Sequence, residues 1–520
     1  MRVLTAEQMQ KVDAETIARV VPGIELMERA GRGVTKAILA RYGKQGKACI
    51  FVGPGNNGGD GLVVARLVCE AGWKCSVHLL KTTDLTPDTQ KNYQRLDKKS
   101  INEIDASRPD WTKLATEDLA DATVIVDAIF GTGFKGAPRG RAAEMIALIN
   151  ATKAALKTPV IAIDIPSGVD GTTAEVGGEA IRATATITIG VPKMGLVFFP
   201  GKEHVGELSV IDIGFPPELI DAHSNPWFYL DEEAAARKLP KRRPDIHKYE
   251  AGRLLLIAGS DAYRGAALLA AEAALRGGCG MVYFAVPEGI RAEVSVALRE
   301  AVTIPLPQTK DVTIGRGALE VLEEYREKAD AIAIGPGLGR NDETDEFVRK
   351  FVALSKRPVV LDADGLMAFP GHTSEFVTAH APIVVTPHGG EMKKLVPDSG
   401  DGTPIEKFAE TVELARRLGV ILVRKGAPTL VASPDGDAYV NATGSSALAT
   451  VGTGDVLAGL LGSLIAQGAT PLDAACIACF LHGRAGELAA AEKGVRGVIA
   501  GDLMPLLGAA MRSLESRAPA

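Results

Sequence analysis

Cysteine is scarce in this sequence, with six among 520 residues. So few cysteines exclude a disulfide framework and suit a reducing compartment. Long apolar runs are also lacking: no uninterrupted stretch is long enough to span a bilayer, and the opening MRVLTAEQMQKVDAETI has no apolar core of signal-peptide length. We therefore expect a cytoplasmic protein without a membrane partner.

An excess of positive charge is missing as well. Lysine and arginine number 58 against 64 aspartate and glutamate residues, which gives a formal net charge of -6. These totals do not suggest a basic face, and we expect no nucleic-acid partner. With 46% hydrophobic and 23% charged residues, the composition is that of an ordinary globular protein, and its length suits two large domains.

Two blocks of alternating strand and helix patterns are present, separated by a stretch rich in proline and charge. The first block has the strand candidates ACIFVG, CSVHLL, TVIVDAIF, PVIAIDI, ATITIG and LSVIDIG, and the second repeats the pattern from RLLLIAGS onward. This alternation predicts the α/β class, with mostly parallel sheets covered by helices on both faces. We expect a Rossmann-like three-layer domain over residues 1–215, a linker over 216–243, and an α/β/α domain over 244–520.

The stretch VGPGNNGGDG follows the first strand candidate and precedes a helical pattern. Gly53, Gly55 and Gly58 have the spacing of a dinucleotide-binding loop, but the absence of Gly-Lys-Ser/Thr excludes a P-loop. A dehydrogenase would need an acidic residue at the end of the next strand to hold a ribose, and Lys81 stands there instead. A redox role for a bound dinucleotide is therefore disfavoured.

Oxygen-bearing side chains crowd this stretch, which a plain cofactor loop does not need. Asn56, Asn57 and Asp60 lie in the loop, and Asp127 and Asp164 end two further strand candidates. A single aspartate at a strand end is usually a turn or helix-cap residue. Several such clusters at one sheet edge favour a binding site, and their oxygens suit a hard cation.

Four stretches, ELMERAG, GPGNNGGDGLVVAR, VDAIFGTGFKG and DIPSGVDG, resemble the epimerase domain of the NAD(P)H-hydrate repair enzymes. The resemblance implies that Asp164 contacts the hydrated dinucleotide and acts as acid and base, and that Asn57, Asp127 and Ser167 bind potassium. A positioned carboxylate suits proton transfer near the hydroxyl-bearing ring carbon. The implied substrate loops are Asn56, Asn57, Gly58, Gly59 and Asp60, and Gly131, Thr132, Gly133, Phe134, Lys135, Gly136 and Ala137.

The strongest motif of the second block is VGTGDVLAGLLG. Gly452, Thr453 and Gly454 open an apolar helix, whose free N–H groups and dipole can hold an anion. Asp455 in the first turn is either a helix-stabilising acid or a base beside a transferred phosphoryl group. Lys425 and a His388/Glu391 cluster follow neighbouring strand candidates, which favours the second interpretation.

This block resembles the ribokinase-like superfamily and, more closely, ADP- or ATP-dependent NAD(P)H-hydrate dehydratase. The shared stretches include GPGLG, LDADGL, TPHGGEMKKL, VRKGAPTLVASPDG and NATGSSALATVGTGDVLAG. The resemblance implies that a nucleotide phosphorylates the ring hydroxyl of the S-hydrate and that phosphate elimination restores NAD(P)H. It implies that Asp455 is the base and that Ala266, Gly337, His388 and Asp455 bind the hydrate. The implied ADP-binding residues are Lys425, Gly426, Ala427, Pro428, Thr429 and Gly454, with Glu391 as a weaker candidate for organising Mg²⁺.

Cys476 and Cys479 form a C-x-x-C pair, with His482 three residues further on. On a helix these residues share one face, so a metal or redox site is conceivable. No second ligand pair of matching spacing is visible, and free cysteine is a common buried residue in alanine-rich helices. We therefore expect a structural role for the pair.

The sequence as a whole predicts a bifunctional repair enzyme that epimerises R- and S-NAD(P)H hydrate and dehydrates the S form with ADP. One alternative is a ribokinase-like small-molecule kinase with a nucleotide-binding accessory domain; another treats the first domain as a non-catalytic scaffold. Sequence does not decide between ADP and ATP, or between NADH and NADPH hydrate. We expect a homo-oligomer.

Overall fold

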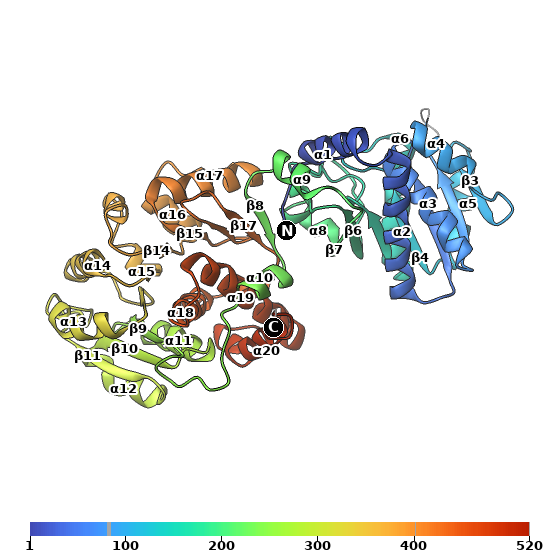
Figure 1. The fold of residues 1–520 in the computed structure, drawn as a ribbon. Coiled ribbons are helices and arrows are strands. Elements are labelled where there is room, and N and C mark those ends of the chain that lie inside the picture. Colours follow the sequence, from blue (N-terminus) through green and yellow to red (C-terminus); the bar gives the residue numbers. More distant parts are fainter. Residues whose placement is uncertain (81–84, 401, 519–520) are drawn as a thin grey trace. The chain divides into compact units, whose positions relative to one another are not determined.

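A computed structural model describes residues 1–80, 85–400 and 402–518 of the chain. Lys81, which argued against a ribose-binding acid, lies outside these residues. The chain divides into an N-terminal unit, Arg2–Trp227, and a C-terminal unit, Phe228–Ala520 with Met1 (Figure 1). Both units are built from helices packed on a sheet of largely parallel strands, which confirms the predicted α/β class.

The N-terminal unit contains a sheet of seven strands, and every neighbouring pair is parallel. Its central strands are continuous apolar runs because helices cover both faces. In spatial order the strands are β3 (Ile101–Asp105), β2 (Lys74–Leu79), β1 (Lys47–Val52), β4 (Val124–Ala128), β5 (Val160–Ile163), β6 (Ala185–Ile189) and β7 (Glu207–Ile211). The carboxyl ends of all seven strands therefore meet at one edge.

Two pairs of helices cover this sheet. Val34 of α2 and Leu62 of α3 pack on one face, and Trp111 of α5 and Met145 of α6 pack on the other. A separate apolar cluster includes Met9 of α1 and helix α9. The helices are α1 (Ala6–Arg19), α2 (Gly23–Tyr42), α3 (Asn56–Glu70), α4 (Pro87–Gln94), α5 (Trp111–Leu119), α6 (Gly140–Leu156), α7 (Met194–Val197), α8 (Lys202–Val205) and α9 (Pro217–His223).

The segment expected as a linker, 216–243, contains regular structure. Helix α9 buries Leu219 in the N-terminal unit, whereas strand β8 (Trp227–Leu230) and helix α10 (Glu232–Lys238) bury Leu230 and Ala235 in the core of the C-terminal unit. The division between the units falls inside this segment, after Trp227. The sequence suggested a simple connection because this segment is rich in proline and charge. Its few apolar residues are nevertheless buried in the cores of the two units.

The C-terminal unit contains a sheet of ten strands. Neighbouring strands are parallel from β11 to β15, and antiparallel pairs join β15, β16 and β17. In spatial order the strands are β11 (Val302–Leu306), β10 (Met281–Pro287), β9 (Arg253–Ile257), β12 (Ala331–Ile334), β13 (Val359–Leu361), β14 (Ile383–Val385), β15 (Ile421–Arg424), β16 (Leu430–Ala432), β17 (Ala438–Asn441) and β8.

Helices lie on both faces of this sheet (Figure 1). One face packs against α10, α11, α18, α19 and α20 in a single apolar core, and α13 and α17 contact the sheet as well. The remaining helices are α11 (Arg264–Arg276), α12 (Arg291–Ala297), α13 (Ala318–Lys328), α14 (Asp342–Leu354), α15 (Ala363–Leu366), α16 (Gly389–Leu395), α17 (Pro404–Leu418), α18 (Thr453–Ala466), α19 (Pro471–Lys493) and α20 (Leu503–Glu515). Within the described residues, no helix is both long and apolar enough to cross a membrane.

Candidate functional sites

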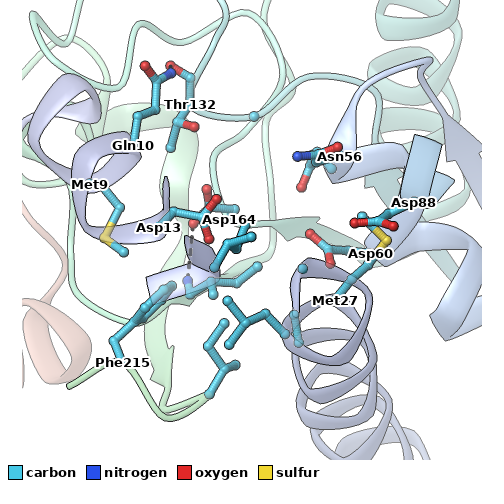
Figure 2. A pocket seen from close by; sticks show the side chains of 18 of the residues that line it. Met9, Gln10, Asp13, Met27, Asn56, Asp60, Asp88, Thr132, Asp164 and Phe215 are labelled. Atoms are coloured by element: carbon cyan, nitrogen blue, oxygen red, sulfur yellow. Dashed lines mark hydrogen bonds between the residues drawn. The ribbon is translucent and has the colours of Figure 1, made fainter. Parts of the chain in front are cut away.

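The N-terminal unit has a cleft at the carboxyl edge of its sheet. Its walls come from α1, α2, the start of α3 and the segments that follow β5 and β6 (Figure 2). Four polar side chains are central to it: Asp13, Asp60, Asp164 and Lys193. Met9, Met27 and Phe215 add an apolar surface, so the cleft combines charged groups with a surface on which a ring could lie.

Asp164 directly follows β5 and is fixed by donors from the next strand. Its Oδ1 accepts hydrogen bonds from Lys193 Nζ at 2.5 Å, Thr188 Oγ1 at 3.0 Å and the Ile189 amide at 3.1 Å. Its backbone φ is +65°, a conformation that costs a residue with a side chain about 1 kcal/mol or more. Three donors on one oxygen leave Oδ2 for the cleft, as a positioned acid/base group requires.

Lys193 lines the cleft beside Asp164 and was not singled out by the sequence. Its side chain is only 1% exposed, and besides Asp164 its ammonium donates to the Ile189 carbonyl at 2.7 Å. A lysine is almost never buried to this degree without a partner. The available signal was a lysine soon after the strand candidate ATITIG, where the cleft of a parallel sheet is expected.

The expected potassium ligands lie close together beneath the cleft. Asp127, the residue before the last of β4, accepts hydrogen bonds from the Ser167 hydroxyl at 2.6 Å and the Ser167 amide at 2.8 Å. The Ser167 hydroxyl also accepts from the Phe130 amide, whose carbonyl accepts from Asn57 Nδ2 at 2.8 Å. Burial raises the pKa of Asp127 to about 6, although the hydrogen bonds from Ser167 and Ile129 oppose it.

The stretch Asn56–Asp60 is the beginning of α3, with Gly55 as its N-cap. Asn56, Asn57 and Asp60 line the cleft. Gly58 and Gly59 instead permit close packing, because a Cβ on Gly58 would lie 1.9 Å from the Gly53 carbonyl oxygen and one on Gly59 would lie 2.5 Å from the Met27 sulfur.

The second expected substrate loop divides in the same way. Gly131 and Thr132 line the cleft, and a Cβ on Gly131 would lie 3.1 Å from that of Asn57. The ring of Phe134 stacks on Phe130, Lys135 pairs with Glu7 at 2.9 Å, and the backbone of Gly136 lies against Gly177. In the described structure, Gly133 and Ala137 are also outside the set that lines the cleft.

Two further carboxyls of the cleft were not assigned an acid/base role by the sequence. Burial, reinforced by the charge of Asp164, raises the pKa of Asp13. The pKa of Asp60 is raised well above its usual range, chiefly by burial and to a smaller extent by the charges of Asp164 and Asp13. The charge of Lys193 opposes this shift. Both carboxyls therefore hold a proton more tightly than an exposed aspartate does.

The second site lies at the start of α18 in the C-terminal unit. Gly452 caps this helix with a φ of +91°, where a Cβ would lie 2.7 Å from Leu269. Gly454 faces the ammonium of Lys425, which would be 3.4 Å from a Cβ at that position. Both glycines thus keep the helix N-terminus open, as anion binding there requires.

Lys425 follows β15 and lies between two carboxylates. Its Nζ is 2.7 Å from Asp362 Oδ1 and 3.6 Å from Glu391 Oε2, and the Thr386 hydroxyl also donates to Asp362. Burial alone would lower the pKa of Lys425, but the carboxylates of Asp362, Glu391 and Asp455 outweigh it, so the pKa is raised. Lys425 is therefore a fixed cation at this edge of the sheet.

Asp455 shares this charged environment. Burial raises its pKa to about 7, and the nearby charges of Asp362, Asp364 and Glu391 add to the effect while Lys425 opposes it. Asp362 is 2% exposed and belongs to the LDADG stretch, in which the sequence singled out no residue. A carboxyl that titrates near neutrality beside a lysine is well suited to take a proton from a hydroxyl.

His388 and Glu391 form a reciprocal cap at the start of α16. His388 Nδ1 accepts from the Gly390 amide at 2.9 Å, and Glu391 Oε2 accepts from the His388 amide at 2.8 Å. Because Nδ1 is an acceptor, the proton of the neutral ring is on Nε2, and that atom can donate to a ligand. The side chain of His388 is 59% exposed, so a ligand can reach it.

The other expected residues of this unit take up the following positions. Ala266 and Gly337 are neighbours, since a Cβ on Gly337 would lie 3.0 Å from that of Ala266. Gly426, Ala427 and Pro428 connect β15 to β16, and the Thr429 hydroxyl donates to the Gly426 carbonyl at 3.1 Å.

Cys476 and Cys479 are buried in α19 and free. Burial raises the pKa of the Cys479 thiol to about 12, so it is a poor metal ligand or nucleophile. His482 Nε2 hydrogen-bonds the Thr453 carbonyl at 2.9 Å, and burial lowers the pKa of this histidine to about 4. These features agree with the structural role expected for the pair.

Comparison with known proteins covers both units. The family model described as YjeF-related protein N-terminus matches residues 23–195, and that described as NAD(P)H-hydrate dehydratase matches residues 254–507. The bifunctional NAD(P)H-hydrate repair enzyme Nnr of Moorella thermoacetica is 38% identical over 99% of this chain and 97% of the relative. The protein of that name from Thermofilum pendens is 36% identical over 99% and 97%.

Solved structures resemble the second part of the chain. The ADP/ATP-dependent NAD(P)H-hydrate dehydratase of Bacillus subtilis, co-crystallised with ATP and Mg²⁺, is 31% identical. The match covers 55% of this chain and 98% of that one, with a TM-score of 0.48.

Proposed function

We propose roles for individual residues on the premise that this chain belongs to the family of bifunctional NAD(P)H-hydrate repair enzymes. It is accordingly an enzyme with two activities, epimerisation of hydrated NAD(P)H and its nucleotide-dependent dehydration. The single observation that carries this function is that relatives bearing that name match nearly the whole chain, so that both units are covered. A kinase with an accessory domain, or a scaffold, would leave one of the two matches unexplained.

In the N-terminal unit, Asp164 is the proposed acid/base group. Lys193 positions it by a direct hydrogen bond to Oδ1. Asn56, Asn57, Asp60, Gly131 and Thr132 would contact the hydrated dinucleotide, because they line the same cleft. Gly58, Gly59 and the stretch 133–137 would shape the cleft from behind.

Potassium fits the residues beneath the cleft. Asn57 Oδ1 is buried without a hydrogen-bond partner in the described structure, and Asp127 and Ser167 add only oxygen donors. A hard monovalent cation takes such a set of ligands. When bound, it would supply positive charge that neutralises Asp127 and holds Asn57 and the neighbouring Gly131 in place.

In the C-terminal unit, Asp455 is the proposed base that deprotonates the ring hydroxyl of the S-hydrate. Lys425 and the open N-terminus of α18 at Gly454 would hold the transferred phosphoryl group. Residues 426–429 would hold the rest of the nucleotide, with ADP as the proposed donor. Ala266, Gly337 and the Nε2–H of His388 would contact the dinucleotide.

Magnesium is compatible with Glu391 in a limited way. One oxygen of this carboxylate caps α16 and lies 3.6 Å from Lys425, so Oε1, which lies 3.5 Å from His388 Nε2, is the oxygen that could bind an ion. Magnesium usually keeps several waters and needs only one or two carboxylates beside the nucleotide phosphates. It would neutralise phosphate charge during transfer.

The test starts from a mixture of R- and S-hydrate with ADP or ATP, and follows absorbance at the reduced-nicotinamide band. Complete recovery of NAD(P)H is expected. Asp164→Ala should stop recovery at the S fraction, and Asp455→Asn should prevent recovery altogether. Accumulation of a stable phosphorylated product, resolved by HPLC, would instead identify a kinase.

Two remaining expectations stay predictions. Cysteines that are all free agree with the proposed cytoplasmic location. The homo-oligomer is to be tested by light scattering of the full chain.

A further inference from the structure

Among the described residues that line the cleft of the N-terminal unit, carboxyls outnumber the single lysine. Asp13 of α1, Asp60 of α3 and Asp164 line it, and Lys193 pairs directly with Asp164 alone of these three. A fourth carboxylate, Asp88 of α4, is paired with Lys91 at 2.9 Å. Burial and the charges of neighbouring carboxylates accordingly raise the pKa of both Asp13 and Asp60.

Asp60 is the carboxyl whose surroundings most favour the protonated form. In the described structure its side chain makes neither a hydrogen bond nor an ion pair, and only 8% of the residue is exposed. Asp164, by contrast, has three donors on one oxygen. These unequal surroundings suit Asp60 to the role of proton donor and Asp164 to that of proton acceptor.

The two groups approach the cleft from different elements. Figure 2 shows Asp164 beside Asp13, with Asp60 on the opposite side of the cavity next to Met27. Asp164 follows strand β5, whereas Asp60 belongs to α3. A planar ring between them would present one face to each carboxyl.

The chemistry of the substrate makes such an arrangement useful. Because the ring nitrogen donates electrons into the double bond of NAD(P)H, water adds with its hydroxyl on the carbon next to that nitrogen. Inverting this carbon without oxidation requires a bond to be broken on one face and remade on the other. The nitrogen lone pair can hold the carbon as a planar C=N⁺ centre between the two steps.

We propose, on the basis of the function given above, that Asp60 and Asp164 form a two-sided acid–base pair that inverts this carbon by loss and re-addition of water. Asp60 donates its proton to the hydroxyl oxygen, the C–O bond breaks, and water leaves as the ring nitrogen forms the C=N⁺ bond. A water on the other face adds to the carbon and gives its proton to Asp164. Asp60 has lost one proton and Asp164 has gained one, so the pair resets by exchanging a proton with solvent.

The first test uses the unaltered full chain without nucleotide, in water labelled with heavy oxygen. Pure R-hydrate is supplied, and the S-hydrate formed is separated by chiral chromatography. Its oxygen-isotope content is then measured by mass spectrometry. We expect each inverted molecule to carry one heavy oxygen, above the exchange seen without enzyme. Inversion that retains the original oxygen would overturn the proposal, because the C–O bond would then have stayed intact.

The second test uses Asp60→Asn, with Glu70→Gln as matched control. Glu70 is at the other end of α3 and pairs with Arg66 at the surface, so this control removes a carboxylate from the same helix. We expect Asp60→Asn to lower kcat for epimerisation at least about 100-fold with KM nearly unchanged, the range typical of a lost acid/base group. The control should retain the full rate.

The outcomes separate this proposal from the function on which it rests. A kcat for Asp60→Asn within a few-fold of the unaltered enzyme, or a raised KM with normal kcat, would overturn the acid role. If Asp60→Asn unfolds the N-terminal unit in a thermal melt, the oxygen label decides alone. If the unaltered enzyme does not interconvert the hydrates at all, the proposed function fails.

Discussion

The dehydration step should depend on pH in a way that follows from Asp455. Its pKa is raised from 3.8 to about 7, first by burial and then by the carboxylates of Asp362, Asp364 and Glu391. A base must be ionised to work, so kcat/KM for pure S-hydrate should rise about tenfold per pH unit below about 7 and become level above it. At pH 5 about a hundredth of the plateau activity would remain.

Asp362→Asn tests the cause of this midpoint. Removing that charge takes away a group that raises the pKa of Asp455 and frees Lys425, which lowers it. Both changes should move the midpoint of the pH profile to lower pH, even if the maximal rate falls because Lys425 is less well held. A midpoint near 4 in the unaltered enzyme, or one that stays near 7 in Asp362→Asn, would refute this electrostatic reasoning.

The same pKa predicts an effect on stability. A carboxyl whose folded-state pKa is raised binds its proton more tightly in the folded than in the unfolded protein. The free energy of unfolding therefore decreases as the pH rises from about 4 to about 7, and it does not decrease further above about 7. At about 1.4 kcal/mol per pKa unit, the difference corresponds to roughly 4 kcal/mol as an upper bound. Asp455→Asn should therefore abolish dehydration and yet raise the melting temperature of the ligand-free protein more at pH 8 than at pH 5. A loss of stability at pH 8 would contradict the assignment of a buried, ionised Asp455.

Three further predictions concern other residues. Lys193→Met should reduce epimerisation about 100-fold or more and leave dehydration of S-hydrate unchanged, so that recovery from the mixed hydrate stops at the S fraction. Ser167→Ala should lose the stimulation of epimerisation by potassium over sodium, measured at constant ionic strength; an unchanged stimulation would locate the cation elsewhere. Gly452→Ala, at a φ of +91° and against Leu269, should cost about 1–3 kcal/mol in stability and weaken nucleotide binding, measured by denaturant unfolding and calorimetry.

Much of the fold and of the site regions followed from the sequence, for physical reasons. Apolar runs that end in Gly, Asp or Ser predicted parallel strands whose carboxyl ends share an edge, and Asp127 and Asp164 are at such positions, whereas Asp455 was found from the glycine-rich start of its helix. The sequence could not separate glycines that contact a ligand from glycines that permit packing. Gly58, which packs against the Gly53 carbonyl, is of the second kind. Both kinds of position require a residue without a Cβ, so the sequence shows glycine at each.

The residues that sequence reasoning missed are those whose environment depends on long-range contacts. A lysine is normally exposed, so Lys193 and its burial against Asp164 could be recognised only once β5 and β6 were paired. Asp362 and Asp364 stand two residues apart in LDADG, and only the folded chain shows that Lys425 pairs with Asp362. The same holds for Asp60, whose pKa depends on Asp164, more than 100 residues later in the chain.

The two units, although they differ in sheet order, use a similar electrostatic device. In each, a lysine pairs with an aspartate at the carboxyl edge of the sheet: Lys193 with Asp164 and Lys425 with Asp362. In each, a second carboxyl near the start of a glycine-rich helix, Asp60 or Asp455, has a raised pKa because it is buried beside that pair. In the described structure neither Asp60 nor Asp455 forms an ion pair with the lysine beside it, so burial of these two carboxyls continues to favour their protonated form.

This imbalance suits both reactions, since each must move a proton to or from the same hydroxyl. A cleft with equal numbers of lysines and carboxylates would be more stable, but it would hold no proton that is easily moved. Adding a cation should therefore impair either site. Met27→Lys beside Asp60, or Leu269→Lys near the start of α18, should lower the pKa of the second carboxyl and reduce only the activity of its own unit. Measuring epimerisation and dehydration separately in each variant tests this, and a loss of both activities in either variant would indicate general misfolding instead.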